Sequence, residues 1–211
     1  MAPVDTPPEI IKRLVQTLEN AIREKNAKLV WNGAKAAEYF FGNEQTAWLD
    51  PAWSNTLLRA LSFAMKNHKN NKVKINCLTA LNIRRVQSEI LSRPEQLIQI
   101  FHDCVDVAEA VPQMVTQVGE IDYRSKLRDL CCESVTALAQ DLDNTVLQQI
   151  IQNRREMLTP VFEEYVNHHG YGKLDSLTKK NKTVLQPILQ SLDLSNNNIL
   201  FNIPTEEPIA S

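Results

Sequence analysis

The sequence lacks the features that mark membrane, secreted and strongly charged proteins. No apolar run reaches the roughly 18 residues needed to cross a bilayer, and residues 1–5 lack the charged and apolar regions of a signal peptide. A net charge of −2 excludes an overall electrostatic bias. With five glycines and few alternating runs of β-branched residues, the chain offers little material for a sheet. We therefore expect a helical intracellular protein, cytoplasmic or nuclear.

Cysteine is scarce and poorly placed for disulfides. The four cysteines are Cys77, Cys104, Cys131 and Cys132; all fall inside helical patterns, and two are adjacent. Such spacing is a poor framework for stapling a secreted domain, so it favours a reducing compartment. Because adjacent residues on a helix point in different directions, we predict one packed and one partly exposed thiol at Cys131 and Cys132.

The sequence contains no recognisable catalytic or cofactor-binding motif. A glycine-rich phosphate loop, a nucleophile elbow and an H-E-x-x-H zinc motif are all missing. The adjacent His168 and His169 diverge by about 100° on a helix and have no thiol or carboxylate at ligand spacing, which argues against a metal site. We expect a solvated or helix-capping pair there. The sequence predicts a protein that is not an enzyme and has no cofactor.

The most informative feature present is an internal repeat. Residues 28–37 (KLVWNGAKAA) return as residues 72–81 (KVKINCLTAL), with Lys, Asn and Ala matching and the apolar spacing kept. A period of about 44 residues, with a helix before each copy, is typical of HEAT or armadillo helical pairs, which bury their apolar faces against neighbouring repeats. We predict an all-α fold, a right-handed α-solenoid of about three HEAT-type helical pairs with a divergent C-terminal helical cap.

The repeat spacing divides the chain into three regions. Residues 1–142 carry the HEAT-type repeats, and residues 143–192 predict divergent terminal helices of the same array. Residues 193–211, with three consecutive asparagines and two prolines, predict a disordered tail.

Local signals predict where helices begin and which faces they bury. Capping boxes at residues 6–9 and 92–95 and the dipeptides Asp50-Pro51 and Thr159-Pro160 indicate helix starts. Small residues such as Gly33 in the helix from about residue 27 to 41 allow close approach to neighbouring helices. The expected buried stripe of the first helix consists of Ile10, Ile11, Leu14, Val15, Leu18, Ala21 and Ile22.

Several short motifs resemble one family of helical repeats. In chain order they are Val30-Trp31-Asn32-Gly33-Ala34, Ala52-Trp53-Ser54, Asn71-Lys72-Val73-Lys74-Ile75, Ala80-Leu81 and Tyr123-Arg124-Ser125-Lys126-Leu127-Arg128. From about residue 10 to 142 the chain resembles the carboxyl-terminal part of the HEAT repeat-containing protein 6 family. The resemblance implies an α-solenoid with protein-interaction character and brings no reaction or cofactor. It also implies a basic residue that links neighbouring turns through acidic partners, kept at Lys74 and replaced by Val30 in the first copy.

Charge is segregated into two consecutive blocks. Residues 59–93 carry eight lysines and arginines against one acid, Glu89, whereas residues 94–122 carry six acids and no lysine or arginine. Because consecutive repeats stack, we expect the blocks to neutralise each other across turns; the alternative is a bipolar docking surface that steers partners. A sharper basic patch consists of Lys69, Lys72, Arg84 and Arg85. It is short, lacks interleaved aromatics and precedes the acidic block, which argues against nucleic-acid binding.

These features together predict a non-catalytic scaffold or adaptor for protein partners. Polar residues that share the repeat phase define a predicted concave face, at Asn32, Lys35, Asn76 and Thr79, with Lys74 as a further basic contact. The alternative function is a carrier like the solenoids of nuclear transport, which is an analogy of fold alone.

Exposed apolar residues would mark further contacts. Trp31 and Trp53 are expected in the core, whereas an exposed Trp48 on the loop between repeats would mark a partner site. An uncapped first repeat would present Ile10, Leu14 and Leu18, or their outward neighbours, to another copy of the chain. No membrane contact is expected.

Overall fold

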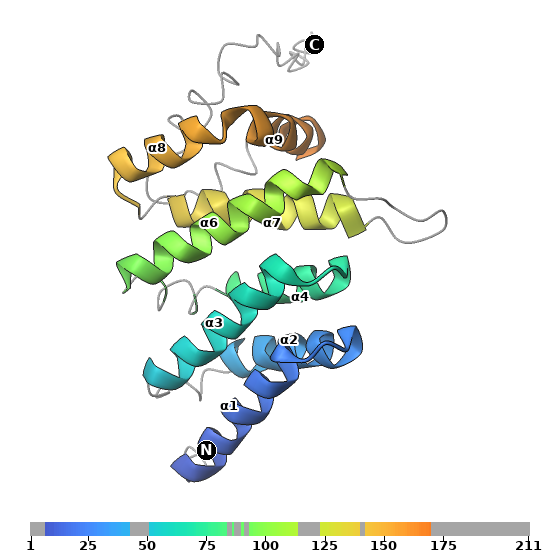
Figure 1. The fold of residues 1–211 in the computed structure, drawn as a ribbon, viewed down its shortest axis with the longest axis vertical. Helices are drawn as coiled ribbons and strands as arrows, with labels where there is room; N and C mark the ends of the chain where they lie inside the picture. The colour runs from blue at the N-terminus through green and yellow to red at the C-terminus, as the bar shows by residue number, and fades with distance from the viewer. Residues whose placement is uncertain are drawn as a thin grey trace, which may run out of the picture.

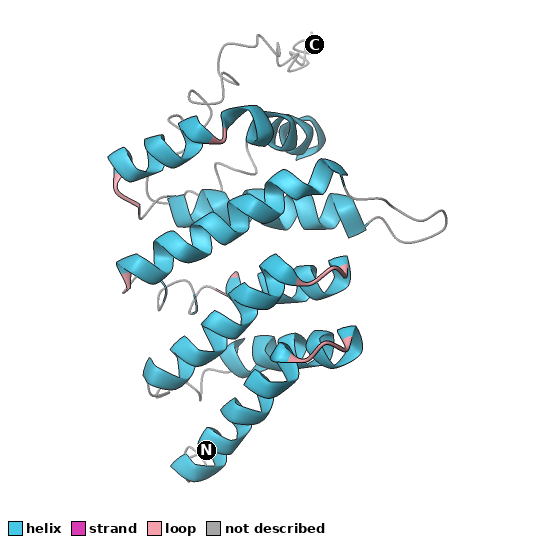
Figure 2. Cartoon of the chain, in the orientation of Figure 1, coloured by secondary structure: helices cyan, strands magenta, loops and turns pink. Residues whose placement is uncertain are grey.

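The computed structural model describes residues 7–42, 51–83, 86, 90, 93–113, 123–139 and 142–169. Within these residues the chain forms eight α-helices and one short 3-10 turn, Val111–Gln113, without a strand, which confirms the all-α prediction for this part. No helix in it has the length and apolar character to cross a membrane. Figure 2 shows these helices in cyan and the described loops and turns in pink. Trp48, Arg84, Arg85, the chain beyond residue 169 and the predicted cap residues Thr6 and Ser92 lie outside the described residues.

Consecutive helices pack in pairs, and the pairs lie one after another along the long axis of the molecule (Figure 1). α1 with α3 and α3 with α6 form one layer, and α2 with α4 and α4 with α7 form the other. α9 packs on both α6 and α7 and contacts α8. The helices are α1 Pro8–Arg23, α2 Ala27–Gly42, α3 Pro51–Asn67, α4 Asn71–Leu81, α6 Pro94–Ala110, α7 Tyr123–Ala139, α8 Asn144–Asn153 and α9 Arg155–His169.

The two copies of the sequence repeat occupy matching places on α2 and α4, which lie side by side. Lys28 and Lys72 are each the second residue of their helix. Asn26 and Asn70 precede them, and each side-chain Oδ1 accepts a hydrogen bond of 2.9 Å from the lysine backbone N–H. These asparagines satisfy donors that the first turn of a helix leaves unpaired. The repeat therefore includes a shared helix start as well as a shared apolar pattern.

The predicted capping boxes are corrected by the structure. The N-cap residue is Pro7 in α1 and Arg93 in α6, and neither residue caps its helix through a side-chain hydrogen bond. Both helices begin instead with a proline, whose fixed φ suits the first turn and whose missing N–H would have been unpaired there. The predicted start at Thr159-Pro160 is also wrong, because Pro160 lies inside α9.

The apolar face of α1 is only partly covered. Ile11, Val15, Leu18 and Ile22 are buried, but Ile10 is 56% and Leu14 is 43% exposed. α1 belongs to the first pair and makes its main contacts with α2 and α3, which leave these two side chains outside the packing. The predicted buried stripe of α1 is thus too wide, because it includes Ile10 and Leu14. The prediction that the first pair presents Ile10 and Leu14 to solvent is confirmed, whereas Leu18 is buried.

Both adjacent cysteines are buried, which corrects the prediction of a partly exposed thiol. α7 is covered by α4, α6 and α9, so both sides of the helix face neighbours. Cys132 lies 3.9 Å from the Val161 carbonyl of α9. Cys77 and Cys104 are buried as well, and burial raises the pKa of all four thiols, that of Cys77 to about 12. They are therefore protonated packing residues at neutral pH.

Gly33 provides the close approach of α1 and α2. A Cβ added at Gly33 would lie 3.0 Å from the Ala21 Cβ and 3.2 Å from the Ile22 backbone nitrogen, neither of which can move without its helix. Overpacking costs about 1–3 kcal/mol, which exceeds the roughly 1 kcal/mol that alanine gains over glycine in a helix. We expect Gly33→Ala to lower the free energy of unfolding by about 1 kcal/mol in urea titrations.

Gly42 supplies the matched control, because it ends the same helix and a Cβ there would have no atom within 4 Å. Gly42→Ala is expected to be neutral or slightly stabilising. If Gly33→Ala stabilised the protein as Gly42→Ala does, the close packing of α1 on α2 would be wrong.

Candidate functional site

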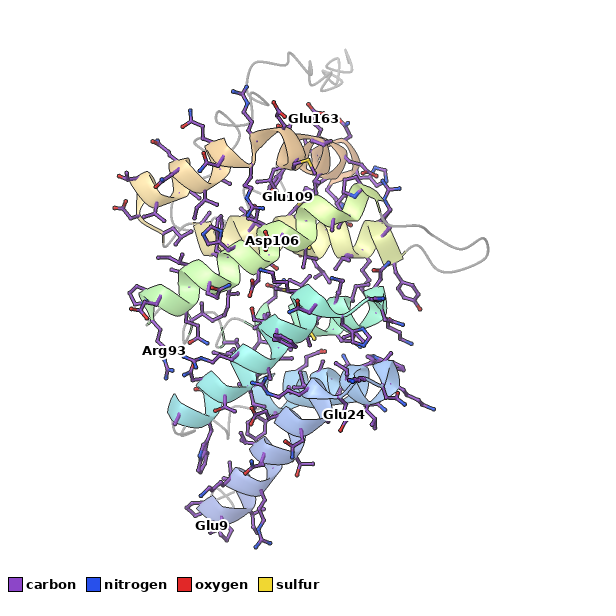
Figure 3. The ribbon with its side chains drawn as sticks, viewed as in Figure 1. Glu9, Glu24, Arg93, Asp106, Glu109 and Glu163 are labelled. Carbon is purple, nitrogen blue, oxygen red and sulfur yellow. The ribbon has the colours of Figure 1, made fainter. Side chains whose placement is uncertain are left out.

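A depression on the described surface runs alongside α3, and we call it the α3 groove. It consists of two hollows that share Phe63 and Asn67. The larger, about 710 Å³, lies between α3 and the first half of α6. The smaller, about 440 Å³, lies between the C-terminal ends of α1 and α3. In Figure 3, Arg93 and Glu24 mark the two ends of this groove.

The larger hollow is lined in part by the Asp103 carboxylate, which already has its hydrogen-bond partners within the fold. Asp103 on α6 is buried and accepts hydrogen bonds from the Ser62 hydroxyl at 2.6 Å and the Gln99 amide at 3.0 Å. The Lys66 ammonium donates to it at 3.1 Å. Because a buried charge is tolerated when it is paired and hydrogen-bonded, Asp103 fixes α6 against α3 and contributes little negative charge to the groove.

The charge blocks partly neutralise each other, as predicted, through Lys66. Its ammonium lies 2.7 Å from Asp106 as well as 3.1 Å from Asp103. The other strong partner of the acidic block comes from outside the basic block: Arg154 Nη1 lies 2.9 Å from Asp106 and 2.7 Å from Glu109. Figure 3 shows Asp106 and Glu109 near the contact of α6 with the terminal pair. We call these ion pairs of Lys66 and Arg154 with Asp103, Asp106 and Glu109 the ladder; it joins α3, α6 and the α8–α9 junction.

Asp106 gives the ladder a pH dependence. Burial raises the pKa of its carboxyl, but hydrogen bonds from Lys66 and Arg154 outweigh burial and hold the pKa below its ordinary value. The unfolded chain therefore binds this proton more tightly. The stabilisation is present above the ordinary pKa of about 3.9 and is lost as the pH falls through the lower folded-state value.

We expect Asp106→Asn to unfold less steeply between about pH 5 and 2, followed by circular dichroism, because the titrating group is gone. Glu95→Gln removes a carboxylate exposed in the first turn of the same helix and should keep the wild-type acid transition. An unchanged transition in Asp106→Asn would contradict the role given to the ladder.

The rim of the groove is basic and carries an exposed aromatic ring. Phe63 is 56% exposed at the junction of the two hollows. Arg59 and Arg93 line the larger hollow, and Lys25 and Lys69 line the smaller one. Such an arrangement can hold an apolar side chain beside Phe63 and carboxylates beside the basic groups.

Gln96 adds polar atoms that have no described partner. It lines the larger hollow from α6, and both its amide nitrogen and its amide oxygen are buried without a hydrogen bond in the described part of the chain. Buried amide groups are normally paired, so these atoms mark a place where an incoming polar group gains hydrogen bonds.

The predicted concave face lies on the other layer, and few of its polar groups are available. Asn32 is exposed on α2, and the Lys35 ammonium lies 2.8 Å from Glu38 on the same helix. The Thr79 hydroxyl donates to the Ile75 carbonyl at 2.8 Å, and the Asn76 amide nitrogen is buried. The predicted residues thus lie at equivalent positions of α2 and α4, but the polar groups of Asn76 and Thr79 on α4 are largely engaged in packing.

Lys74 is the clearest departure from the predicted site. It is only 8% exposed, and its ammonium donates to the backbone carbonyls of Met65 at 3.1 Å and Lys66 at 3.0 Å. These carbonyls end α3, where the last turn leaves acceptors unpaired. Lys74 therefore caps the C-terminal end of α3, the helix with which α4 is paired. The prediction that it contacts acidic residues of neighbouring turns is wrong, because its hydrogen-bond partners are backbone oxygens.

The remaining predicted residues fall near the start of α4. The Lys72 ammonium lies 3.4 Å from the centre of the Trp31 ring, a cation–π contact between α4 and α2. Trp31 and Trp53, expected in the core, are partly buried and pack against it. Lys69 is exposed and belongs to the α3 groove.

A second polar cluster, between α7 and α9, was not predicted. Arg128 is 1% exposed and pairs with Asp129 at 2.9 Å and with Glu164 at 2.5 Å. The Tyr165 hydroxyl lies 3.2 Å from Glu133.

His169 belongs to the same cluster, with its ring 2.8 Å from Asp129 and packed against Tyr165. His169 is therefore held by another helix, whereas His168 is exposed. Both histidines lie in the last turn of α9, which agrees with the helix-capping alternative of the prediction, and only His168 is solvated. The sequence carried one signal for this cluster: Arg128, Asp129 and Glu133 on α7 have the same spacing as Glu164, Tyr165 and His169 on α9.

Comparison with known proteins gives no assignment for this site. No protein-family model matches the chain, and no solved structure is significantly similar to it. What the chain does must therefore be inferred from its own side chains.

Proposed function

We propose that the chain is an α-solenoid of HEAT type that acts as a non-catalytic scaffold or adaptor and binds protein partners. The observation that carries the proposal is the matching position of the repeat on α2 and α4, each opened by an asparagine cap and packed side by side. Stacked helical pairs create extended surfaces that suit long or flat partners. The resemblance to the HEAT repeat-containing protein 6 family belongs to the same proposal.

The α3 groove is favoured as the contact surface over the predicted concave face. It is open, spans three helices and keeps Arg59, Phe63 and Lys69 exposed. On the other layer Lys74 is buried and the Thr79 hydroxyl is bonded to its own helix. A partner gains more from exposed aromatic and arginine side chains than from groups already engaged in packing.

Proximity labelling in cells, followed by reciprocal purification of each candidate with the full chain, tests the protein-binding function. We expect at least one protein to co-elute with the chain in size-exclusion chromatography. Two results would contradict the proposal: no protein co-elutes, or the chain instead forms a tight nucleic-acid complex with a steep salt dependence.

A further inference from the structure

Charge and shape in the α3 groove select one kind of occupant. Six lysine or arginine side chains line the two hollows against three carboxylates. Lys66 pairs with Asp103 and Arg23 pairs with Glu19, so the positive charge that an occupant meets comes chiefly from Arg59, Lys25 and Lys69. α6 also begins at this edge without a side-chain cap, which adds the positive end of its helix dipole. Phe63, at the junction of the two hollows, places an apolar surface between the basic side chains of one hollow and those of the other. We propose that the α3 groove binds an extended acidic segment of a protein partner that carries one apolar anchor.

Helix geometry sets the spacing of that segment. Arg59 precedes Phe63 by one turn on α3, so the two side chains lie about 6 Å apart along the axis at 1.5 Å per residue. An extended peptide covers this distance in about two residues at 3.3 Å each. The preferred segment therefore has an apolar residue with an Asp or Glu about two positions away, for Arg59, and a second carboxylate on the other side of the apolar residue, for Lys25 and Lys69.

Nucleic acid fits the same groove less well. Glu24 and Glu95 stand at its two ends, where a phosphate backbone would have to pass. A single aromatic ring gives one stacking position, whereas single-stranded nucleic acid is usually held by several stacked bases along a continuous basic track. Nucleic acid carries a charge on every phosphate, whereas a protein segment can carry carboxylates beside the basic side chains and uncharged residues beside Glu24 and Glu95.

The backbone of such a segment has partners as well. Its amide N–H and C=O groups match the Gln96 side chain, whose nitrogen and oxygen are buried without a partner among the described residues. One hydrogen bond in each direction would satisfy both atoms. This inference rests on the proposed function and names its partner class.

The test is selection of a random peptide library, displayed on phage, against the full chain, followed by fluorescence anisotropy of the enriched peptides. We expect enriched peptides with net negative charge and a central apolar residue. Arg59→Glu and Phe63→Ser should each weaken their binding at least tenfold. Lys12→Glu, exposed on α1, and Tyr39→Ser, exposed on α2, make comparable changes elsewhere and should stay within about twofold.

Enrichment of basic peptides, equal binding to Arg59→Glu, or tighter binding of single-stranded RNA in the same assay would overturn the inference. The outcome is separable from that of the proposed function. If co-eluting proteins are retained by both groove variants, the groove assignment fails and protein binding stands. If no protein co-elutes with the wild-type chain, the proposed function itself fails.

Discussion

Replacing Lys74 by glutamate is expected to destabilise the fold by about 3–5 kcal/mol, the usual cost of an uncompensated buried charge. The lysine ammonium donates to the Met65 and Lys66 carbonyls at the end of α3. A carboxylate in that place would meet carbonyl oxygens and the negative end of the α3 dipole, with little access to water. Urea denaturation followed by circular dichroism measures the loss.

Lys69→Glu makes the same charge change at an exposed position near the same helix end and should cost no more than about 0.5 kcal/mol. Lys74→Met should lose less than Lys74→Glu, because burial lowers the pKa of Lys74 and its charge is already costly. The folded chain binds that proton less tightly, so this group adds stability as the pH rises toward its ordinary pKa. Equal losses in Lys69→Glu and Lys74→Glu would contradict the buried position of Lys74.

Arg128→Ala is expected to cost about 3 kcal/mol, at the lower end of the range for breaking a buried pair. Arg128 is 1% exposed and joins α7 to Glu164 on α9, so truncation removes both an ion pair and the packing of a long side chain. Glu164 and Asp129 are partly exposed and can regain water, which keeps the loss at that lower end. Thermal unfolding monitored by calorimetry gives the change.

Lys126→Ala, exposed on the same helix, is the matched control and should change stability by less than about 0.5 kcal/mol. A double-mutant cycle with Glu164→Gln should show coupling between Arg128 and Glu164 of about 1 kcal/mol or more. If the two changes were additive, the contact between α7 and α9 at this point would be wrong.

The features predictable from the sequence are those set within one helix. The 3.6-residue period located the buried faces, and the small residue at Gly33 indicated the close contact that α1 and α2 make. Prolines marked true helix starts at Pro51 and Pro94. Pro160 misled because it is the sixth residue of α9: a proline there removes one backbone hydrogen bond, but the helix continues through it.

The α3 groove could not be predicted, because its walls meet only through tertiary packing. Arg59 and Phe63 stand on α3, whereas Arg93 and Gln96 come from the start of α6, and no local pattern states how two helices cross. The burial of Cys132 has a similar cause: α9 covers α7, although the repeat spacing fades before α9 begins. Lys74 was wrongly predicted to be available to a partner. The position of a residue in the repeat indicates the helix face on which it lies, but a long side chain can fold back from that face to a neighbouring helix.

The most direct test is amide hydrogen exchange of the full chain, measured by mass spectrometry with and without a co-eluting protein partner. Binding is expected to slow exchange in α3, Pro51–Asn67, and in the first turns of α6, while α2 and α4 stay unchanged. Protection confined to α2 and α4, or spread over neither layer, would contradict the assignment of partner binding to the α3 groove.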